Sequence, residues 1–462
     1  MGRRTATKTK RARATATAAP ARDDATRARR ALRVVIVLYL FAAVLYATTI
    51  PFGAGPDETA HLRYLEYLAQ HHRFPVFDPA HPDPDYEVHQ PPLYYLLALP
   101  TYMVAGLSAA PMYSNNVPGE AVRFVSLLIG VALIYLTFAL ARRLVPDRPW
   151  TAVAAAGLVA FLPMHLHLVS SIGNDVLAEV FAAAVLVLLV GAVRAAAEYR
   201  AGGRAAPPVT GAVWVGVFIG LSLLTKSLGA VLLPVAWLGV VLTGRGPERY
   251  EWKRMLRDLA VVTAVALVIA GPWLVRNQLL YGDPLAQRAF LEGFKGRRPS
   301  PESMMRMAPA LGLTGYIEMV AAWTFASALG VFGPISEMSF VFYPWPVYVV
   351  AAVVALAAAV GFLRHLLRRQ ITGWGARAWV VMGAFGALLL ASFVRFNFDF
   401  FQAQARYLFP AISPAALAFA LGVEELASPR QRWWVSCAVA ALLAVLAFAG
   451  LLLWIAPEFV SR

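Results

Sequence analysis

Long apolar runs, separated by short polar segments, recur along the chain from residue 32 onward. Runs such as 348–363 and 433–455 contain no charged residue, and many approach the roughly 20 residues that a helix needs to cross a bilayer. The period-two alternation expected of a membrane β-barrel is absent. Because backbone groups in lipid must be satisfied within their own segment, the pattern predicts an all-α, polytopic transmembrane helical bundle.

Basic loops decide which apolar runs cross the membrane. Short loops rich in Lys and Arg are retained in the cytoplasm, so the number of crossings between two such loops must be even. That parity excludes 93–109, which contains Pro100, and 308–331, and we expect both to lie on the outer face as juxtamembrane or re-entrant segments. Eleven spans remain, near residues 32–50, 121–141, 151–170, 176–193, 211–226, 228–243, 258–275, 341–363, 378–394, 407–423 and 433–455.

The polar parts of the chain complete the predicted organisation. Residues 1–31 are rich in Ala, Thr and Arg and are expected to form a disordered basic cytoplasmic tail, followed by a retained signal anchor. Residues 32–456 form the transmembrane domain, including two long outer loops, 51–120 and 276–339, which hold most of the acidic residues, histidines and prolines. Residues 457–462 are expected to be a short outer C-terminus.

Composition excludes several classes of protein. With 59% hydrophobic and 15% charged residues, the chain has too much apolar sequence for a soluble core. Much of the net charge of +15 comes from the N-terminal tail, which favours membrane lipids as partners rather than nucleic acid. The single cysteine, Cys437, excludes an intrachain disulfide and a cysteine metal cluster. No Walker loop is present, which argues against an ATP-driven pump.

Acidic residues at the outer ends of two spans are the first candidates for chemistry. Asp57 and Glu58 directly follow the first span, and adjacent carboxylates can serve as a general base and a helper that positions it or binds a cation. They would equally suit the first turn of a surface helix, where negative charge meets the helix dipole. Asp175, after Asn174, is either a helix-capping residue or a second catalytic acid.

Three cations, Lys226, Arg276 and Arg406, also lie at outer helix ends. The spans around Lys226 are too short for two full crossings, so Lys226 should lie below the outer surface. A lysine at that depth either faces a wet cavity or an anion, or extends its ammonium to the headgroups. Three cations around one cavity would suit a phosphate or pyrophosphate.

A run of polar and aromatic residues precedes and begins the expected surface helix. It runs from Glu87 to Tyr95 and contains His89, Gln90, Tyr94 and Tyr95, which would line the mouth of a cavity or form an interfacial aromatic belt. The histidines of the first outer loop, His61 among them, have no tight metal-ligand spacing, so no metal site is expected.

In this order, these features resemble the GT-C superfamily of membrane glycosyltransferases, and most closely the protein O-mannosyltransferase and lipid A aminoarabinose transferase group. The resemblance runs from about residue 35 to 425. Its pieces are Asp57-Glu58, His89-Gln-Pro-Pro-Leu-Tyr-Tyr95, Arg123, Asn174-Asp175, Gly220-Leu-Ser-Leu-Leu-Thr-Lys226, Trp273-Leu-Val-Arg-Asn277, Tyr281-Gly-Asp-Pro284 and Gln404-Ala-Arg-Tyr-Leu-Phe-Pro410.

The resemblance implies an inverting glycosyltransferase that moves a hexose or pentose from a polyprenyl-phosphate carrier to a glycan, lipid or protein acceptor. The reaction would take place on the outer face of the cytoplasmic (plasma) membrane. The resemblance implies a catalytic carboxylate at Asp57 or Glu58, with Asp57 favoured, and donor-phosphate contacts from Lys226, Arg276 and Arg406. No obligatory cofactor is expected, although the acid-rich site leaves a divalent cation open. The expected cavity residues are His61, His89, Gln90, Tyr94, Tyr95, Arg123, Asn174, Gln404 and Tyr407.

Two other functions compete with this interpretation. A secondary transporter or lipid flippase would need charges near mid-membrane and internal repeats, whereas the charges here lie at outer helix ends and no repeat is visible. A structural or assembly protein would be favoured if Asp57, Glu58 and Asp175 could all be neutralised without effect.

Overall fold

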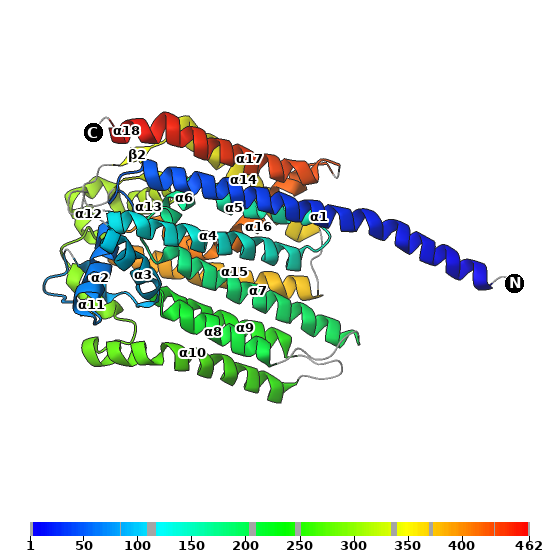
Figure 1. Ribbon diagram of the computed structural model, residues 1–462, viewed down its shortest axis with the longest axis horizontal. Helices are drawn as coiled ribbons and strands as arrows, with labels where there is room; N and C mark the ends of the chain where they lie inside the picture. The colour runs from blue at the N-terminus through cyan, green and yellow to red at the C-terminus, as the bar shows by residue number, and fades with distance from the viewer. Residues whose placement is uncertain are drawn as a thin grey trace.

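The computed structural model is a bundle of α-helices, most of them running side by side (Figure 1). It describes residues 3–83, 85–108, 117–202, 209–244, 251–333, 340–368, 373–428 and 430–460, with residues 3–22, 107–108 and 460 described by their backbone alone. Parts of the predicted basic loops (203–208, 245–250 and 369–372), parts of the two long outer loops (84, 109–116 and 334–339) and the last two residues of the expected outer C-terminus lie outside these ranges.

Eight of the described helical segments are long and apolar enough to cross a membrane. They are α1 (Arg3–Thr49), α4 (Val117–Leu144), α7 (Asp175–Arg200), α10 (Trp252–Tyr281), α14 (Trp345–Arg368), α15 (Gly373–Asp399), η5 with α16 (Ala405–Ala411 and Ile412–Leu426), and α17 with η6 and α18 (Arg432–Gly450, Leu451–Ile455 and Ala456–Val460). A ninth is the pair α5 (Pro149–Phe161) and α6 (Pro163–Val169), bent by 64°.

Two shorter apolar segments follow α7. These are α8 (Thr210–Leu223) and the pair of η2 (Ser227–Val231) and α9 (Leu232–Thr243). Together with the longer segments they match the eleven predicted spans in order. The prediction of an all-α membrane bundle is therefore confirmed, and the chain is an integral membrane protein.

The two excluded apolar runs take other forms. The run after residue 92 forms α3 (Leu93–Ser108), which packs against α4 and α2 (Glu58–His71). The run after residue 308 forms η3 (Pro309–Leu311), α13 (Gly312–Leu329) and the short strand β1 (Val331–Phe332), which pairs antiparallel with β2 (Val341–Phe342). Neither α3 nor α13 is among the helices that meet the length and hydropathy required of a span.

Burial places α7 at the centre and α14 at the periphery. Most of α7 is buried, whereas α14 leaves Val350, Val353 and Leu356 exposed, as expected of a lipid-facing helix. α14 approaches α16 closely because glycines face each other: a Cβ at Gly422 would lie 2.0 Å from the carbonyl oxygen of Ala358. Small residues at such a crossing allow the dispersion contacts that hold membrane helices together.

The interpretation of residues 1–31 as a disordered tail differs from the structure. There, α1 is helical from Arg3 and its N-terminal half projects beyond the bundle (Figure 1). The physical reason is composition, because alanine and arginine are strong helix formers.

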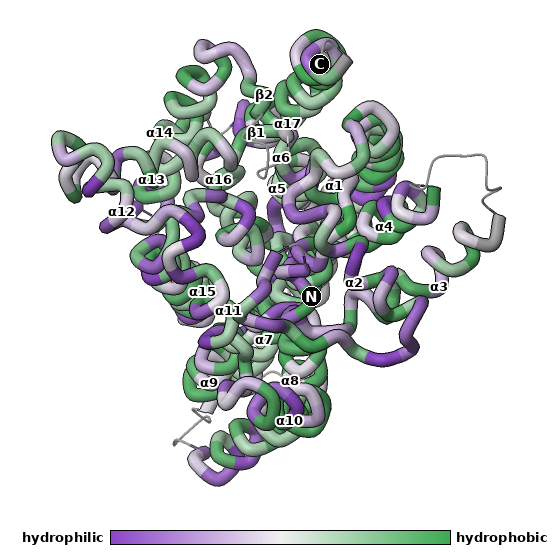
Figure 2. The backbone as a smooth tube through the Cα atoms, turned by 90° about the vertical axis from the view of Figure 1, so that its left-hand side faces the viewer, coloured by the Kyte–Doolittle hydropathy of each residue, from purple (hydrophilic) through white to green (hydrophobic). Residues whose placement is uncertain are grey.

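The polar connections gather at the opposite end of the bundle. α2, η1 (Tyr86–His89), α3, α11 (Gln287–Phe294) and α12 (Pro301–Met307) lie at this end (Figure 1). Viewed from this end, hydrophilic segments are visible between the helices (Figure 2). The fold therefore brings the first and second long loops together at one end.

Candidate active site

Asp57 occupies a constrained position between α1 and α2. Its backbone is left-handed, with φ of 58° and ψ of 13°, a conformation that aspartate tolerates better than most residues. Its carboxylate accepts a hydrogen bond of 2.8 Å from the Tyr86 hydroxyl and forms an ion pair with Arg406. Such a conformation costs energy and persists only where surrounding contacts impose it.

The contacts that hold the loop around Asp57 come from the neighbouring acid, Glu58. Glu58 is fully buried and takes two hydrogen bonds of 2.7 Å from the Arg123 guanidinium. Arg123 also donates to the carbonyl groups at the end of α1, those of Ala47, Ile50 and Pro51. The pair therefore fastens the end of α1 to the start of α2, on both sides of the loop that carries Asp57.

The same carboxylate reaches a third segment. Glu58 accepts hydrogen bonds from the backbone N–H groups of Gly53, at 2.9 Å, and of Ile172, between α6 and α7, at 3.1 Å. A Cβ at Gly55 would lie 2.4 Å from the Ser171 hydroxyl oxygen, so this close approach requires glycine. The adjacent acids are thus separated: Asp57 faces a cavity, whereas Glu58 faces the packed interior.

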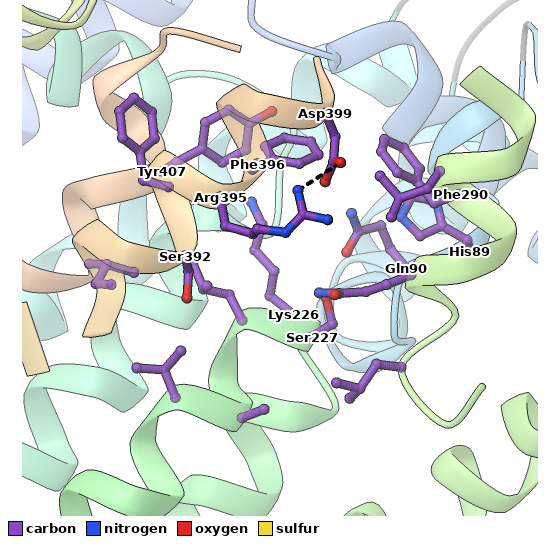
Figure 3. A pocket seen from close by; sticks show the side chains of 18 of the residues that line it. His89, Gln90, Lys226, Ser227, Phe290, Ser392, Arg395, Phe396, Asp399 and Tyr407 are labelled. Atoms are coloured by element: carbon purple, nitrogen blue, oxygen red, sulfur yellow. Dashed lines mark hydrogen bonds and ion pairs between the residues drawn. The ribbon is translucent and has the colours of Figure 1, made fainter. Parts of the chain in front are cut away.

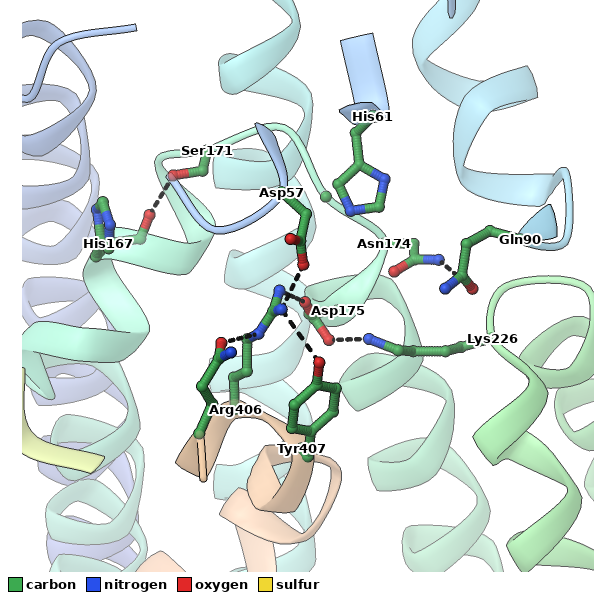
Figure 4. Close-up of polar contacts among 12 residues, drawn as sticks. Asp57, His61, Gln90, His167, Ser171, Asn174, Asp175, Lys226, Arg406 and Tyr407 are labelled. Atoms are coloured by element: carbon green, nitrogen blue, oxygen red, sulfur yellow. Dashed lines mark hydrogen bonds and ion pairs between the residues drawn. The ribbon is translucent and has the colours of Figure 1, made fainter. Parts of the chain in front are cut away.

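Two cations from distant parts of the chain meet the acids Asp57 and Asp175 (Figure 4). Arg406, at the start of η5, contacts both Asp57 and Asp175, the first residue of α7. Lys226, in the break between α8 and η2, forms an ion pair with Asp175. Gln404 holds the Arg406 side chain by accepting a hydrogen bond of 2.8 Å from its Nε. Asp57 and Arg406, which are 349 residues apart in sequence, therefore belong to one network of charges.

The network forms one wall of a cavity of about 400 Å³. Asp57, Lys226, Arg406 and Tyr407 contribute polar groups. Apolar side chains from η2 and α15 line another part, namely Leu228, Val231, Leu389 and Phe393. Arg395 and Asp399 form a 2.7 Å ion pair at the same cavity (Figure 3). The cavity therefore combines a charged part with an apolar part.

The remaining predicted cavity residues divide into two groups. His61, His89 and Gln90 line the cavity. Behind it, Asn174 donates to the Gln90 side chain at 3.2 Å, and Tyr95 bonds to the His61 ring at 2.7 Å. Tyr94, Arg123, Gln404, Glu58 and Asp175 also lie outside the lining and support residues or segments around it.

Arg276 is separated from the other two cations. Its guanidinium donates to the carbonyl oxygen of Pro75 at 2.5 Å and to the Asn277 side chain at 3.3 Å, and it lies 4.4 Å from the ring centroid of Trp273. Arg276 does not line the cavity. In this structure it fastens the first outer loop to α10.

Burial and neighbouring charges shift the pKa values of the loop residues. Burial raises the pKa of Asp57, but the Arg406 guanidinium and His61 outweigh burial, and the pKa falls to about 2. Burial lowers the pKa of His61, and it lowers the pKa of His89 to about 4. Burial raises the pKa of Glu87. Near neutral pH, Asp57 is therefore a carboxylate and both imidazoles are neutral.

Some residues of the site were missed from the sequence. Tyr86, whose hydroxyl bonds to Asp57, directly precedes the polar run that begins at Glu87, so its neighbours already pointed to it. Arg395 and Asp399 lie four residues apart at the end of α15, a spacing that favours an ion pair on one helix face. No group of three His, Cys, Asp or Glu side chains in the described ranges is placed to hold a metal ion.

The geometry can be compared with known proteins. The model of the dolichyl-phosphate-mannose-protein mannosyltransferase family matches residues 101–275. A crystal structure of the Archaeoglobus fulgidus oligosaccharyltransferase with Zn and sulfate superposes with a TM-score of 0.52 and 18% identity, covering 90% of this chain and 52% of that chain. The fold is that of the GT-C glycosyltransferases. The predicted resemblance is thus confirmed.

Two further comparisons were made. The Cupriavidus metallidurans ArnT bound to undecaprenyl phosphate gives a TM-score of 0.48 with 16% identity, covering 91% of this chain and 64% of that chain. No curated protein matches the sequence. The chain spans about half the length of the oligosaccharyltransferase.

Proposed function

We propose that this GT-C chain is an inverting glycosyltransferase. It would move a hexose or pentose from a polyprenyl-phosphate carrier to a glycan, lipid or protein acceptor of the cell envelope. The observation that carries the proposal is the meeting of Asp57, Lys226 and Arg406 in one cavity that also has an apolar wall.

Each part of the cavity suits one part of such a donor. Lys226 and Arg406 provide charge-assisted hydrogen bonds for a phosphate diester. The apolar side chains on η2 and α15 suit the first isoprene units of the carrier. In the comparison structures, ArnT is bound to undecaprenyl phosphate, which is chemically similar to the proposed donor.

In the proposed reaction, an acceptor hydroxyl or amine attacks the anomeric carbon from the side opposite the phosphate. A bond forms between the acceptor and that carbon as the bond from the carbon to the phosphate oxygen breaks, so the configuration inverts. Asp57 takes the proton from the acceptor. The charge that develops on the leaving phosphate is stabilised by Lys226 and Arg406, which are already in place.

Arg406 connects donor binding to the basicity of Asp57. Without a donor, Arg406 is paired with Asp57 and Asp175, and its charge lowers the pKa of Asp57 to about 2. A donor phosphate would draw part of the guanidinium away from Asp57. The pKa of Asp57 would then rise, so that it becomes a better base when a donor is present.

We place the reaction on the outer face of the cytoplasmic membrane. α2 and α11, which carry the cavity residues His61 and Phe290, lie at the end of the bundle opposite the arginine-rich N-terminal half of α1 (Figure 1). Positively charged segments are retained in the cytoplasm, which puts the cavity outside. We assign no step to a metal, and because a role for an additional divalent cation is open to test, transfer is measured with and without EDTA.

The test is transfer by the purified full chain in detergent. Radiolabelled polyprenyl-phosphate hexose and pentose donors would be incubated with total envelope acceptors, with and without EDTA. Wild type would be compared with Asp57→Asn and with Asp83→Asn, an exposed acid in the same loop, as the matched control. Size exclusion would check folding.

We expect label transfer by wild type and Asp83→Asn, and loss of transfer by Asp57→Asn. Equal transfer by Asp57→Asn would remove this carboxylate from the reaction. Absence of transfer by every protein with every donor would favour the transporter or assembly functions instead.

A further inference from the structure

Glu87 and Asp399 are the cavity carboxylates to which the proposed reaction assigns no role. Glu87 lies in η1, is 7% exposed, and lines the cavity together with Asp57, His61 and Gln90. The same short helix carries Tyr86, whose hydroxyl bonds to Asp57. Glu87 therefore lies one residue from a direct partner of the proposed base.

The other acids at the cavity are matched by cations. Asp57 pairs with Arg406, and Asp399 pairs with Arg395 at 2.7 Å. In the described part of the chain, the Glu87 carboxylate forms no hydrogen bond or close ion pair with another residue, although the charges of Lys226 and Arg406 act on it. Its oxygens are not among the fully buried atoms that lack a partner, so they reach the cavity, where a ligand can bond to them.

We propose that Glu87 binds hydroxyl groups of the donor sugar and thereby contributes to the choice of sugar. The inference rests on the proposed function, because the sugar is placed by its link to the phosphate. With that phosphate on Lys226 and Arg406, the attached sugar must occupy the same cavity, which Glu87 also lines.

The chemistry of Glu87 and its surroundings fits a sugar. A carboxyl group has two oxygens, which can accept hydrogen bonds from two neighbouring hydroxyls. Gln90 and the neutral imidazoles of His61 and His89 line the cavity as well, and each can donate or accept a hydrogen bond. Burial also raises the pKa of Glu87, which indicates that its carboxyl group is less solvated than a carboxyl group at the surface.

A catalytic role for Glu87 would leave a different kinetic signature. Asp57 already has the contacts expected of a positioned base, namely Tyr86 and Arg406. A sugar-binding residue should change the affinity for the sugar-bearing donor, whereas a base should change the rate at saturating donor.

The experiment compares two kinds of ligand on the full chain in detergent. One is polyprenyl phosphate without sugar, and the other is the same lipid carrying mannose, glucose or arabinose. Dissociation constants and transfer rates would be measured for wild type, Glu87→Gln and Glu87→Ala. Glu66→Gln serves as the matched control, because Glu66 lies on α2 and does not line the cavity.

We expect wild type and Glu66→Gln to bind at least one sugar-bearing lipid more tightly than the bare lipid. Glu87→Ala should lose this preference by about tenfold or more, the usual worth of a hydrogen bond to a charged group, with bare-lipid affinity unchanged. Glu87→Gln should lose less, because its amide still forms hydrogen bonds.

The inference is overturned if Glu87→Ala keeps the full preference, or if wild type prefers no sugar-bearing lipid. It is also overturned if Glu87→Ala lowers only the rate at saturating donor. Failure of wild type to bind even the bare lipid would instead refute the proposed function.

Discussion

Replacing Glu58 with glutamine separates the roles of the two adjacent acids. The change keeps the size of the side chain but removes the charge that faces Arg123. Arg123 is 2% exposed and Glu58 is 0% exposed, so the guanidinium would remain in the interior without a counter-charge. We therefore expect Glu58→Gln to lower stability, and to affect transfer only as far as folding is affected.

The structure sets the size of the effect. Removing one partner of a buried ion pair costs about 3–5 kcal/mol. Arg123 would keep its bonds to the carbonyl groups of Ala47, Ile50 and Pro51, which favours the lower end, about 3 kcal/mol. Arg123→Met would lose those bonds as well, so its cost should lie nearer the upper end, about 5 kcal/mol.

The assay is the thermal midpoint of monodisperse protein in detergent, followed by transfer measured well below that midpoint. Glu302→Gln is the control, because Glu302 forms an exposed pair with Arg306 and should leave the midpoint unchanged. The thermal midpoint should be highest for Glu302→Gln, lower for Glu58→Gln and lowest for Arg123→Met. A wild-type midpoint combined with complete loss of transfer in Glu58→Gln would refute the reasoning and make Glu58 the reacting acid.

Three further predictions follow from the same geometry. The stability that the Asp57–Arg406 pair contributes should be fully present above pH 4 and lost as the pH falls from 3.8 toward about 2. Asp57→Asn should therefore flatten that part of a plot of thermal midpoint against pH, and an unchanged slope would contradict this prediction. Lys226→Ala and Arg406→Ala should each weaken polyprenyl-phosphate binding about tenfold or more, whereas Arg276→Ala should change it little; equal losses in a binding assay would restore the three-cation site. Gly422→Val should lower the thermal midpoint by forcing α14 away from α16, and an unchanged midpoint would show that this crossing adapts.

Hydropathy was sufficient to locate the helices of the bundle. The exclusion of 93–109 from the spans, which rests on loop charge, stays a prediction, because α3 is a shorter apolar helix just as α8 and α9 are. An apolar run fixes how long a helix can be, and the positions of α8 and α9 followed from that rule. The bend between α5 and α6 did not, because a 64° change of direction at Leu162 depends on packing around a proline rather than on apolar length.

The sequence placed the charged residues of the site at helix ends, but it did not show the direction in which each side chain points. Lys226, Arg276 and Arg406 were all placed at outer helix ends, yet only two of them line the cavity. The rotation of a helix about its axis is decided by packing with its neighbours, which apolar length does not reveal. For the same reason, the sequence left Asp57 and Glu58 as alternatives, while the structure turns them in opposite directions.

The pairing of Asp57 with Arg406 has a consequence for biosynthesis. Asp57 follows α1, whereas Arg406 follows fifteen of the eighteen described α-helices. The acid must therefore wait, already outside the membrane in the proposed orientation, while most of the bundle is inserted. Nascent chains halted before Arg406 would hold the acid without its cation, so the ability to bind donor should appear abruptly, late in translation, rather than grow with each inserted helix.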